Sequence, residues 1–219
     1  MRVAIDGPAG AGKSSIAKAV SKKLGFVYID TGAMYRAVGV YAIENGIEIN
    51  AENFTDEVLD KIKIDIAYVD GTQRIYLLGE DVSQRIREAD VSIAASNVAV
   101  IPAVRLKLVE LQRTLAEKTS VIMDGRDIGT YVLPDAEVKI FLTASSDVRA
   151  KRRLLEMQEK GMEADFETVK RDIEYRDKND SEREFAPLRK AEDAILVDTS
   201  DMTIEQVIDR IIEIIEEGK

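Results

Sequence analysis

The feature that most constrains the fold of this chain is a glycine-rich turn near its N-terminus, Gly7-Pro8-Ala9-Gly10-Ala11-Gly12-Lys13-Ser14. The turn follows a short apolar run at residues 3–5 and precedes a helical pattern, so the order is strand, turn, helix. Glycines keep side chains out of such a turn, and consecutive backbone N–H groups can then surround a phosphate at the positive end of the helix. The alternative is a glycine-rich turn that binds nothing. The complete match to G-x-x-x-x-G-K-S in this context favours a P-loop that binds a nucleoside triphosphate.

The P-loop pattern gives each residue type an expected task. Lys13 is expected to reach the β- and γ-phosphates, and Ser14 to hold Mg²⁺ through its hydroxyl group. The backbone amides of the turn and of the first helical residues complete the site. The expected triphosphate-binding set is Gly7, Pro8, Ala9, Gly10, Ala11, Gly12, Lys13, Ser14 and Ser15.

Composition narrows the chemistry that is available to the chain. The 219 residues include no cysteine and no histidine. Disulfides, thiolate metal sites and histidine-based triads are therefore excluded, and any proton transfer must use carboxylates, lysine, tyrosine, substrate groups or water. The formal net charge of −10 repels extended polyanions, which argues against DNA or RNA as a partner. A small phosphorylated substrate is compatible with this charge if arginines gather in one cleft.

The sequence carries no signal for export or for membrane insertion. Met1 runs directly into the first strand, which leaves no room for a signal peptide. No apolar stretch approaches membrane-spanning length. We therefore expect a cytoplasmic protein without a membrane partner. Because no long apolar surface forces assembly, we also expect a monomer.

Strand and helix patterns alternate along the chain. Strands are expected at residues 3–5, 26–29, 121–123, 138–142 and 194–197, and helices at 13–24, 33–45, 93–100 and 103–115. A last helix is expected after Thr203, which forms a capping-box pattern with Gln206. Short apolar runs of this kind are typical of buried parallel strands. The pattern predicts a three-layer α/β P-loop kinase fold with a five-stranded parallel sheet, whose ligands lie beyond the carboxyl ends of the strands.

Two segments depart from this alternation. Residues 62–69 and 74–78 alternate with period two around Asp70-Gly71, which predicts a β-hairpin in a small inserted subdomain. Residues 171–190 are dense in charge and poor in apolar residues, which predicts a mobile flap that buries little. We therefore expect one kinase domain over residues 1–219. Its expected parts are a core at 1–30, 100–145 and 186–219, an acceptor-binding part at 31–99 with an insert around 60–97, and a helical lid at 146–185.

Arginines are concentrated around the expected lid. Arg149, Arg152 and Arg153 stand at i, i+3 and i+4 of a predicted helix, so they share a face and repel one another unless an anion neutralises them. The alternative is a solvated basic face whose arginines pair with carboxylates such as Glu156. The positions of the arginines alone favour the two interpretations equally. The place of this helix after the fourth strand favours the anion. The flap adds Arg171, Arg176, Asp180 and Arg183, which would close over a transferring phosphoryl group and exclude water.

A second set of polar residues lies where an acceptor would bind. Arg36 follows the second strand in the run Thr31-Gly32-Ala33-Met34-Tyr35-Arg36, and with the helix N-terminus it could hold a phosphate. Arg105 lies in the first turns of the helix after Pro102. Asp124 ends the third strand and is a candidate to support Mg²⁺ through water, although a turn or capping aspartate is an equal alternative on its own. Arg126 and Asp127 would then point into the cleft.

These residues together resemble the bacterial cytidylate kinase family. The resemblance rests on the P-loop and on the runs Asp30-Thr31-Gly32-Ala33-Met34-Tyr35-Arg36, Gly125-Arg126-Asp127-Ile128-Gly129-Thr130, Leu78-Gly79-Glu80-Asp81-Val82-Ser83 and Ala186-Pro187-Leu188. It covers nearly the whole chain in order. It implies the nucleoside monophosphate kinase fold, with transfer of the γ-phosphoryl group of ATP to CMP or dCMP in pyrimidine nucleotide metabolism, and with Mg²⁺ as cofactor.

The resemblance also implies roles for individual residues. Thr31, Arg36, Arg126 and Arg176 would hold the CMP phosphate or neighbouring groups. Ser96, Arg105 and Asp127 would contact the cytosine edge. Asp180 would face the pentose, and Arg183 would lie near the transferring phosphate. Arg152 and Arg153 would lie near ATP and the transfer site. The implied catalytic set is Lys13, Arg126, Arg153, Arg176 and Arg183. The chain departs from familiar relatives at Ser14, where they carry glycine, and at Asn179 and Ser181, where they place further lid arginines.

Three other functions compete with this one. A kinase for another small acceptor would share the P-loop, but the arginines after the second and third strands favour an anionic acceptor. A GTPase-type switch would need an N-K-x-D base motif, and Asp177-Lys178-Asn179-Asp180 has the wrong order. A regulatory ATPase would hydrolyse ATP steadily without any acceptor. Because the acceptor of a nucleotide kinase is an ionised phosphate, a chain without histidine can catalyse this transfer.

Overall fold

A computed structural model describes residues 1–69, 72–159 and 161–218 of the chain. The chain forms two compact units. The first unit contains Met1–Tyr28 and Thr119–Lys219, and the second contains Ile29–Lys118.

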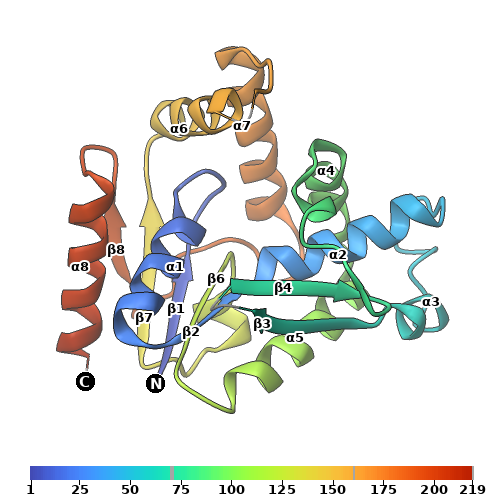
Figure 1. Cartoon of the computed structure of the whole chain (residues 1–219), viewed down its shortest axis with the longest axis horizontal. Coiled ribbons are helices and arrows are strands. Elements are labelled where there is room, and N and C mark those ends of the chain that lie inside the picture. Colours follow the sequence, from blue (N-terminus) through green and yellow to red (C-terminus); the bar gives the residue numbers. More distant parts are fainter. Residues whose placement is uncertain (70–71, 160, 219) are drawn as a thin grey trace. The chain divides into compact units, whose positions relative to one another are not determined.

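A parallel sheet organises the first unit (Figure 1). Its strands are β1 (Arg2–Asp6), β2 (Val27–Asp30), β6 (Val121–Gly125), β7 (Val138–Thr143) and β8 (Ile195–Asp198), in the order β2-β6-β1-β7-β8. Strand β1 pairs in parallel with both β6 and β7, and β7 pairs in parallel with β8. The predicted α/β fold with a five-stranded sheet is confirmed for the described residues. Crossover connections place the carboxyl ends of all these strands at one edge, where ligands bind in such sheets.

Helices α1 (Lys13–Leu24) and α8 (Ile204–Glu217) share one apolar core with the sheet. The α1 helix ends as predicted at Gly25, whose left-handed φ of 69° suits glycine. The α8 helix begins with the predicted capping box: Thr203 accepts from the backbone N–H of Gln206, and the Gln206 side chain accepts from the backbone N–H of Thr203. Its inner face is aliphatic, with Val207, Ile208, Ile211, Ile214 and Ile215 buried.

Helices α6 (Ser146–Glu159) and α7 (Phe166–Glu182) pack against each other around a small cluster of Ala150, Val169 and Ile173 (Figure 1). The sequence predicted a flap from residue 171 that buries little. The structure differs in burial, because α7 buries Ile173 and Asp180, and Arg183 directly after the helix is buried as well. The inner face of this segment consists of one apolar residue, Ile173, and of charged residues that pair with one another. A count of apolar residues therefore does not reveal that this face is buried.

The second unit contains helices and a small antiparallel sheet. Its elements are α2 (Thr31–Glu44), α3 (Asp56–Lys61), β3 (Ile64–Val69), β4 (Thr72–Leu77), β5 (Glu80–Asp81), η1 (Arg85–Arg87), α4 (Ala89–Val98) and α5 (Pro102–Ala116). The register of β3 on β4, from Ile64 opposite Leu77 to Val69 opposite Thr72, confirms the predicted hairpin strands. The expected turn at Asp70-Gly71 lies outside the described residues. The two-residue strand β5 was not predicted, since it is too short to show a period.

Helix α2 packs closely on α4 through Gly39, where an added Cβ would lie 3.1 Å from the Cβ atom of Ala94. Within the described ranges, no single helix is both long and apolar enough to cross a membrane. Within the same ranges, the pair of α4 and α5 reaches that length and composition, and the pair is bent by 99°.

Candidate functional site

The glycines of the P-loop are required by its backbone geometry. Gly7, Gly10 and Gly12 have φ values of 151°, 73° and 86°, in a region that other residues rarely adopt. An added Cβ on Gly7 would lie 1.9 Å from the backbone oxygen of Leu142 in β7. Gly12 is the N-cap of α1 and provides no side chain to satisfy the first backbone amides of the helix. The loop therefore presents amides that suit a phosphate group.

Lys13 is buried and folds back over the loop. Its Nζ atom donates a hydrogen bond to the carbonyl oxygen of Pro8 at 2.8 Å, and the residue is 5% exposed. Burial and the positive charge of Arg126 lower the pKa of Lys13 well below its usual range, while Asp124 opposes this change. An anion bound next to Lys13 would favour its charged form, because opposite charges stabilise each other most where water is excluded.

Ser14 and Asp124 meet at the carboxyl edge of the sheet. The Ser14 hydroxyl donates to Asp124 Oδ2 at 2.8 Å, and the Tyr28 hydroxyl donates to Asp124 Oδ1 at 2.9 Å. Among the described residues, no group of three acidic side chains gathers that could hold a metal by itself. One hydroxyl and one carboxylate fit Mg²⁺ in a nucleotide site, because this ion keeps waters and takes its other ligands from phosphates. The alternative interpretation of Asp124 as a local turn residue is not supported, since both contacts come from other elements.

Asp6 is a buried carboxylate that the sequence analysis did not select. It ends β1 and accepts hydrogen bonds from the backbone N–H groups of Ile128 at 2.8 Å and Gly129 at 2.7 Å. Burial, together with the nearby charge of Asp127, raises the pKa of Asp6 to about 6 against the lowering effect of these bonds. Its position directly before Gly7 was the available signal. Asp6 anchors the start of the short helical segment η2 (Ile128–Val132), which follows β6, to the start of the P-loop.

Four of the predicted site residues form one buried network in the first unit. Arg126 Nε donates to Asp180 Oδ2 at 2.6 Å, and Arg183 Nη2 donates to Asp127 Oδ1 at 3.0 Å. A 3.8 Å ion pair between Arg183 and Asp180 joins the two pairs. Burial alone would raise the pKa of Asp180, but Arg126, Arg183 and the half-buried Arg176 hold it below its usual value. The network brings together the loop after β6 and the end of α7.

The three arginines of α6 have separate partners. Arg149 is buried and bonds Ala9, Ala144 and Asp177. Arg152 donates to the hydroxyl and carbonyl oxygens of Thr199, at 2.9 and 2.6 Å. Arg153 pairs near the surface with Glu156 at 2.9 Å, which is the pairing that the alternative interpretation expected. Their shared spacing therefore does not create a single anion site in this structure.

The remaining predicted residues lie in the second unit. Thr31 is buried at the start of α2, where Asp30 caps the helix by accepting from the Ala33 N–H at 3.0 Å. Arg36 Nη1 lies 4.0 Å from Asp30 Oδ1, and Arg87 Nη2 lies 3.4 Å from Asp30 Oδ2. Asp30 therefore holds two arginines at one helix N-terminus. Of these, Arg87 was not predicted, because it lies more than fifty residues away in the chain.

Helices α4 and α5 carry the other two predicted residues of the second unit. Ser96 is half-buried on α4. Arg105 on α5 is 1% exposed, donates to the carbonyl oxygen of Ala99 at 3.1 Å, and lies over the ring of Tyr35 at 5.6 Å. These contacts fix the guanidinium group, and the ring contact adds a cation–π attraction.

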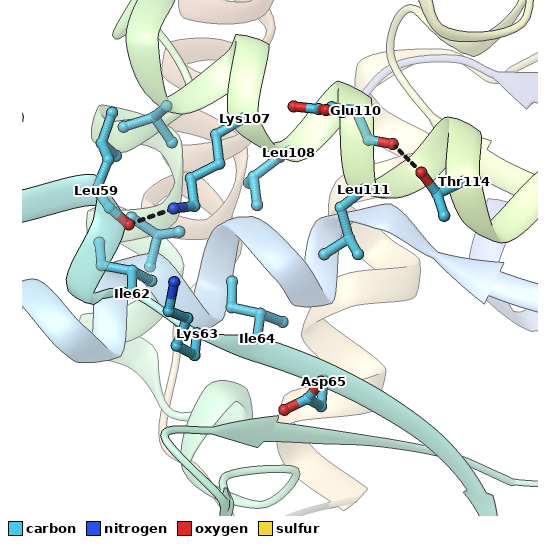
Figure 2. Close-up of a pocket in the computed structure, with 12 residues that line it drawn as sticks. Leu59, Ile62, Lys63, Ile64, Asp65, Lys107, Leu108, Glu110, Leu111 and Thr114 are labelled. Carbon is cyan, nitrogen blue, oxygen red and sulfur yellow. Dashed lines mark hydrogen bonds between the residues drawn. The ribbon is translucent and has the colours of Figure 1, made fainter. Parts of the chain in front are cut away.

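The second unit also contains a cavity of about 490 Å³ between α3, the start of β3 and α5 (Figure 2). Leu59, Ile62 and Leu108 provide part of its apolar lining. Figure 2 shows Lys107 reaching the carbonyl oxygen of Leu59 at one end. The lining contains none of the site residues that the sequence predicted.

Comparison with known proteins identifies the family. A model of the cytidylate kinase family matches residues 3–217. A curated cytidylate kinase of Caldicellulosiruptor saccharolyticus is 54% identical over 214 residues, which cover 98% of this chain and 95% of that protein. A curated cytidylate kinase of Lactobacillus johnsonii is 52% identical over 216 residues, which cover 99% of this chain and 94% of that protein.

A solved structure supports the fold. A gluconokinase from Sinorhizobium meliloti superposes with a TM-score of 0.51 at 12% identity, covering 99% of this chain and 91% of that chain. This likeness concerns the fold alone. The family resemblance seen in the sequence is confirmed by the matches over nearly the full length. The chain belongs to the cytidylate kinase family and is a nucleoside monophosphate kinase.

Proposed function

We propose that this protein transfers the γ-phosphoryl group of ATP to CMP or dCMP and releases CDP or dCDP, with Mg²⁺ as cofactor. The observation that carries the proposal is the family match over residues 3–217, since the curated relatives described above are cytidylate kinases along nearly their whole length. The geometry of the P-loop supports a triphosphate donor. The absence of histidine from the sequence is compatible with this reaction, because the attacking group is a phosphate that is already ionised.

In this proposal the first unit binds the donor. The amides at the start of α1 and the Lys13 ammonium group hold the β- and γ-phosphates. Ser14 would hold Mg²⁺ through its hydroxyl group, and Asp124 would hold it through water. When bound, this ion supplies neutralising charge to the phosphate oxygens. Lys13 is confined to the loop by Pro8, so little conformational freedom remains to be lost when the phosphates bind.

Arginines of the same unit stabilise the transferring group. Phosphoryl transfer depends mainly on positioning and on neutralising charge at the equatorial oxygens. Arg126 and Arg183 are held by Asp180 and Asp127, so their guanidinium groups are already ordered before substrate arrives. Arg176 adds positive charge near Asp180. Arg152 and Arg153 on α6 would contact ATP or the transfer site after exchanging their present partners.

The acceptor is recognised by its phosphate and its base. Thr31 and Arg36 would bind the phosphate of CMP, and Asp180 would face the pentose. Ser96, Arg105 and Asp127 would contact the cytosine edge. A carboxylate that accepts from the 4-amino group of cytosine would disfavour uracil, whose O4 is itself an acceptor. Two acceptors that face each other in a buried site are costly.

An acceptor panel tests this function. The full-length enzyme is incubated with MgATP and with CMP, dCMP, UMP, AMP or GMP, and nucleoside diphosphate formation is measured. We expect CMP or dCMP to react fastest, and Lys13→Ala to abolish turnover while Lys18→Ala, an exposed change on the same helix, retains it. Fastest turnover on AMP, UMP or GMP would contradict the cytidine assignment.

ATP hydrolysis without acceptor separates this function from a regulatory ATPase. A kinase should hydrolyse ATP slowly until an acceptor binds, because water is excluded from the transfer site only in the complete complex. Steady hydrolysis that CMP does not change would favour the ATPase and refute the kinase.

A further inference from the structure

Two lid helices hold a single residue of the P-loop from both sides. The backbone N–H of Ala9 donates to Asp177 Oδ1 of α7 at 3.1 Å, and the Ala9 carbonyl oxygen accepts from Arg149 Nη1 of α6 at 2.8 Å. Arg149 Nη1 also pairs with Asp177 Oδ2 at 2.6 Å. These three contacts form a closed ring of Ala9, Arg149 and Asp177. None of the three residues belongs to the predicted acceptor-binding set.

The ring is largely buried, and Arg149 is held by a further hydrogen bond. Ala9 is 2% exposed, and the side chains of Arg149 and Asp177 are 8% and 23% exposed. Arg149 Nε also donates to the carbonyl oxygen of Ala144 at 2.9 Å, which fixes the arginine to the segment after β7. An added Cβ on Gly10 would lie 3.2 Å from the Arg149 Cβ atom, so the loop lies directly against α6. A charged hydrogen bond in such surroundings resists exchange with water.

The Pro8–Ala9 peptide connects this ring to Lys13. The N–H of this peptide bonds Asp177, and the carbonyl oxygen of the same peptide accepts from Lys13 Nζ at 2.8 Å. A planar trans peptide directs its N–H and its C=O to opposite sides. Rotation of this peptide would therefore break both contacts together. The orientation that Asp177 imposes on one side determines where Lys13 is anchored on the other.

We propose that Asp177 is a positioning residue for Lys13, acting through the Pro8–Ala9 peptide, and that Arg149 holds Asp177 in place. This inference rests on the proposed role of Lys13 at the phosphates of ATP. The glycines of the loop give it many accessible conformations, and ordering them on binding would weaken affinity for the triphosphate. Asp177 and Arg149 order the loop before the nucleotide arrives.

Asp177→Ala and Asp177→Asn test the proposal, with Asp172→Asn as a matched control at an exposed carboxylate of the same helix. Asparagine keeps an oxygen for the Ala9 N–H but loses the charge toward Arg149. Binding of MgATP without acceptor is measured by calorimetry, and KM and kcat are measured with CMP. Loss of one charged hydrogen bond predicts an increase of about tenfold in the MgATP Kd for Asp177→Ala and about threefold for Asp177→Asn. The KM for CMP should change less than about twofold.

Hydrogen exchange distinguishes positioning from general stability. Exchange at the amides of residues 9–12 should accelerate in Asp177→Ala, while exchange in β1 and β6 stays unchanged. An unchanged MgATP Kd in both variants would overturn the proposal, as would equal effects on the KM values for ATP and CMP. If Asp177→Ala does not fold, the isosteric Asp177→Asn decides alone. Failure of the wild type to phosphorylate CMP would refute the proposed function and leave the binding test of Asp177 valid.

Discussion

At the scale of single residues, backbone sterics restrict the choice of amino acid in the P-loop more than side-chain chemistry does. Gly7 combines an unusual φ of 151° with a position at which an added Cβ would lie 1.9 Å from the backbone oxygen of Leu142. A side chain there meets a carbonyl group of a central strand, which cannot move without disrupting the sheet. The glycine is therefore required by the fold before any ligand is considered.

Gly7→Ala is expected to destabilise the protein by about 3 kcal/mol or more, because overpacking against backbone adds to the cost of the strained φ. Gly46→Ala is the matched control, since Gly46 also has a positive φ of 63° but an added Cβ there meets nothing within 4 Å. The control should lose only about 1 kcal/mol. Urea unfolding measures both values, and equal losses would show that the Leu142 contact does not matter.

Asp6 gives a pH dependence whose sign follows from its burial. The pKa of Asp6 in the folded protein is about 6, above its ordinary 3.8, so the folded state binds more protons than the unfolded state between these values. Its contribution to the free energy of unfolding is therefore present at low pH and is lost as pH rises through 6, by about 3 kcal/mol in total.

Comparison with Asp6→Asn isolates this contribution, because asparagine does not titrate. The difference in unfolding free energy between wild type and variant should fall by about 1 kcal/mol between roughly pH 5 and pH 7.5. Urea unfolding at several pH values provides the measurement. A constant difference would mean that Asp6 titrates near its ordinary pKa.

At the scale of elements, helix ends follow local rules that the sequence displays. Both the glycine stop of α1 and the capping box of α8 were predicted and are confirmed. Helix α4 begins at Ala89, four residues before the predicted start at 93. Its N-cap residue, Glu88, makes no capping bond, so no capping pattern in the sequence marked this start. Helix α7 lies in the segment predicted as a helical lid with a charged flap, but its buried face was not predicted, since it depends on ion pairs with distant residues.

Thr203→Ala is expected to destabilise the protein by about 1 kcal/mol, because it leaves the N–H of Gln206 without its side-chain acceptor. Glu216→Ala, an exposed change in the last turn of the same helix, should alter stability by less than about 0.5 kcal/mol. Thermal and urea unfolding would detect the difference. Similar small effects at both positions would show that α8 is held by its aliphatic face alone.

At the scale of the whole molecule, strand order decides which distant residues meet. Strands β1 and β6 are neighbours in the sheet although more than a hundred residues separate them in the chain. Their adjacency brings Ser14, which follows β1, to the Asp124 carboxylate at the end of β6. The same edge brings Asp6 to the amides of Ile128 and Gly129.

The sequence by itself determined the P-loop, the alternation of strands and helices, the hairpin strands and the family. These features depend on short-range backbone geometry and on motifs whose residues are close in the chain. Only the tertiary structure decided which charges pair. In the tertiary structure Arg126 pairs with Asp180, and Arg183 pairs with Asp127. The three arginines of α6 have separate partners, and Asp177 binds the P-loop. Such pairings depend on packing between elements that are far apart in the sequence, so no local pattern of residues predicts them.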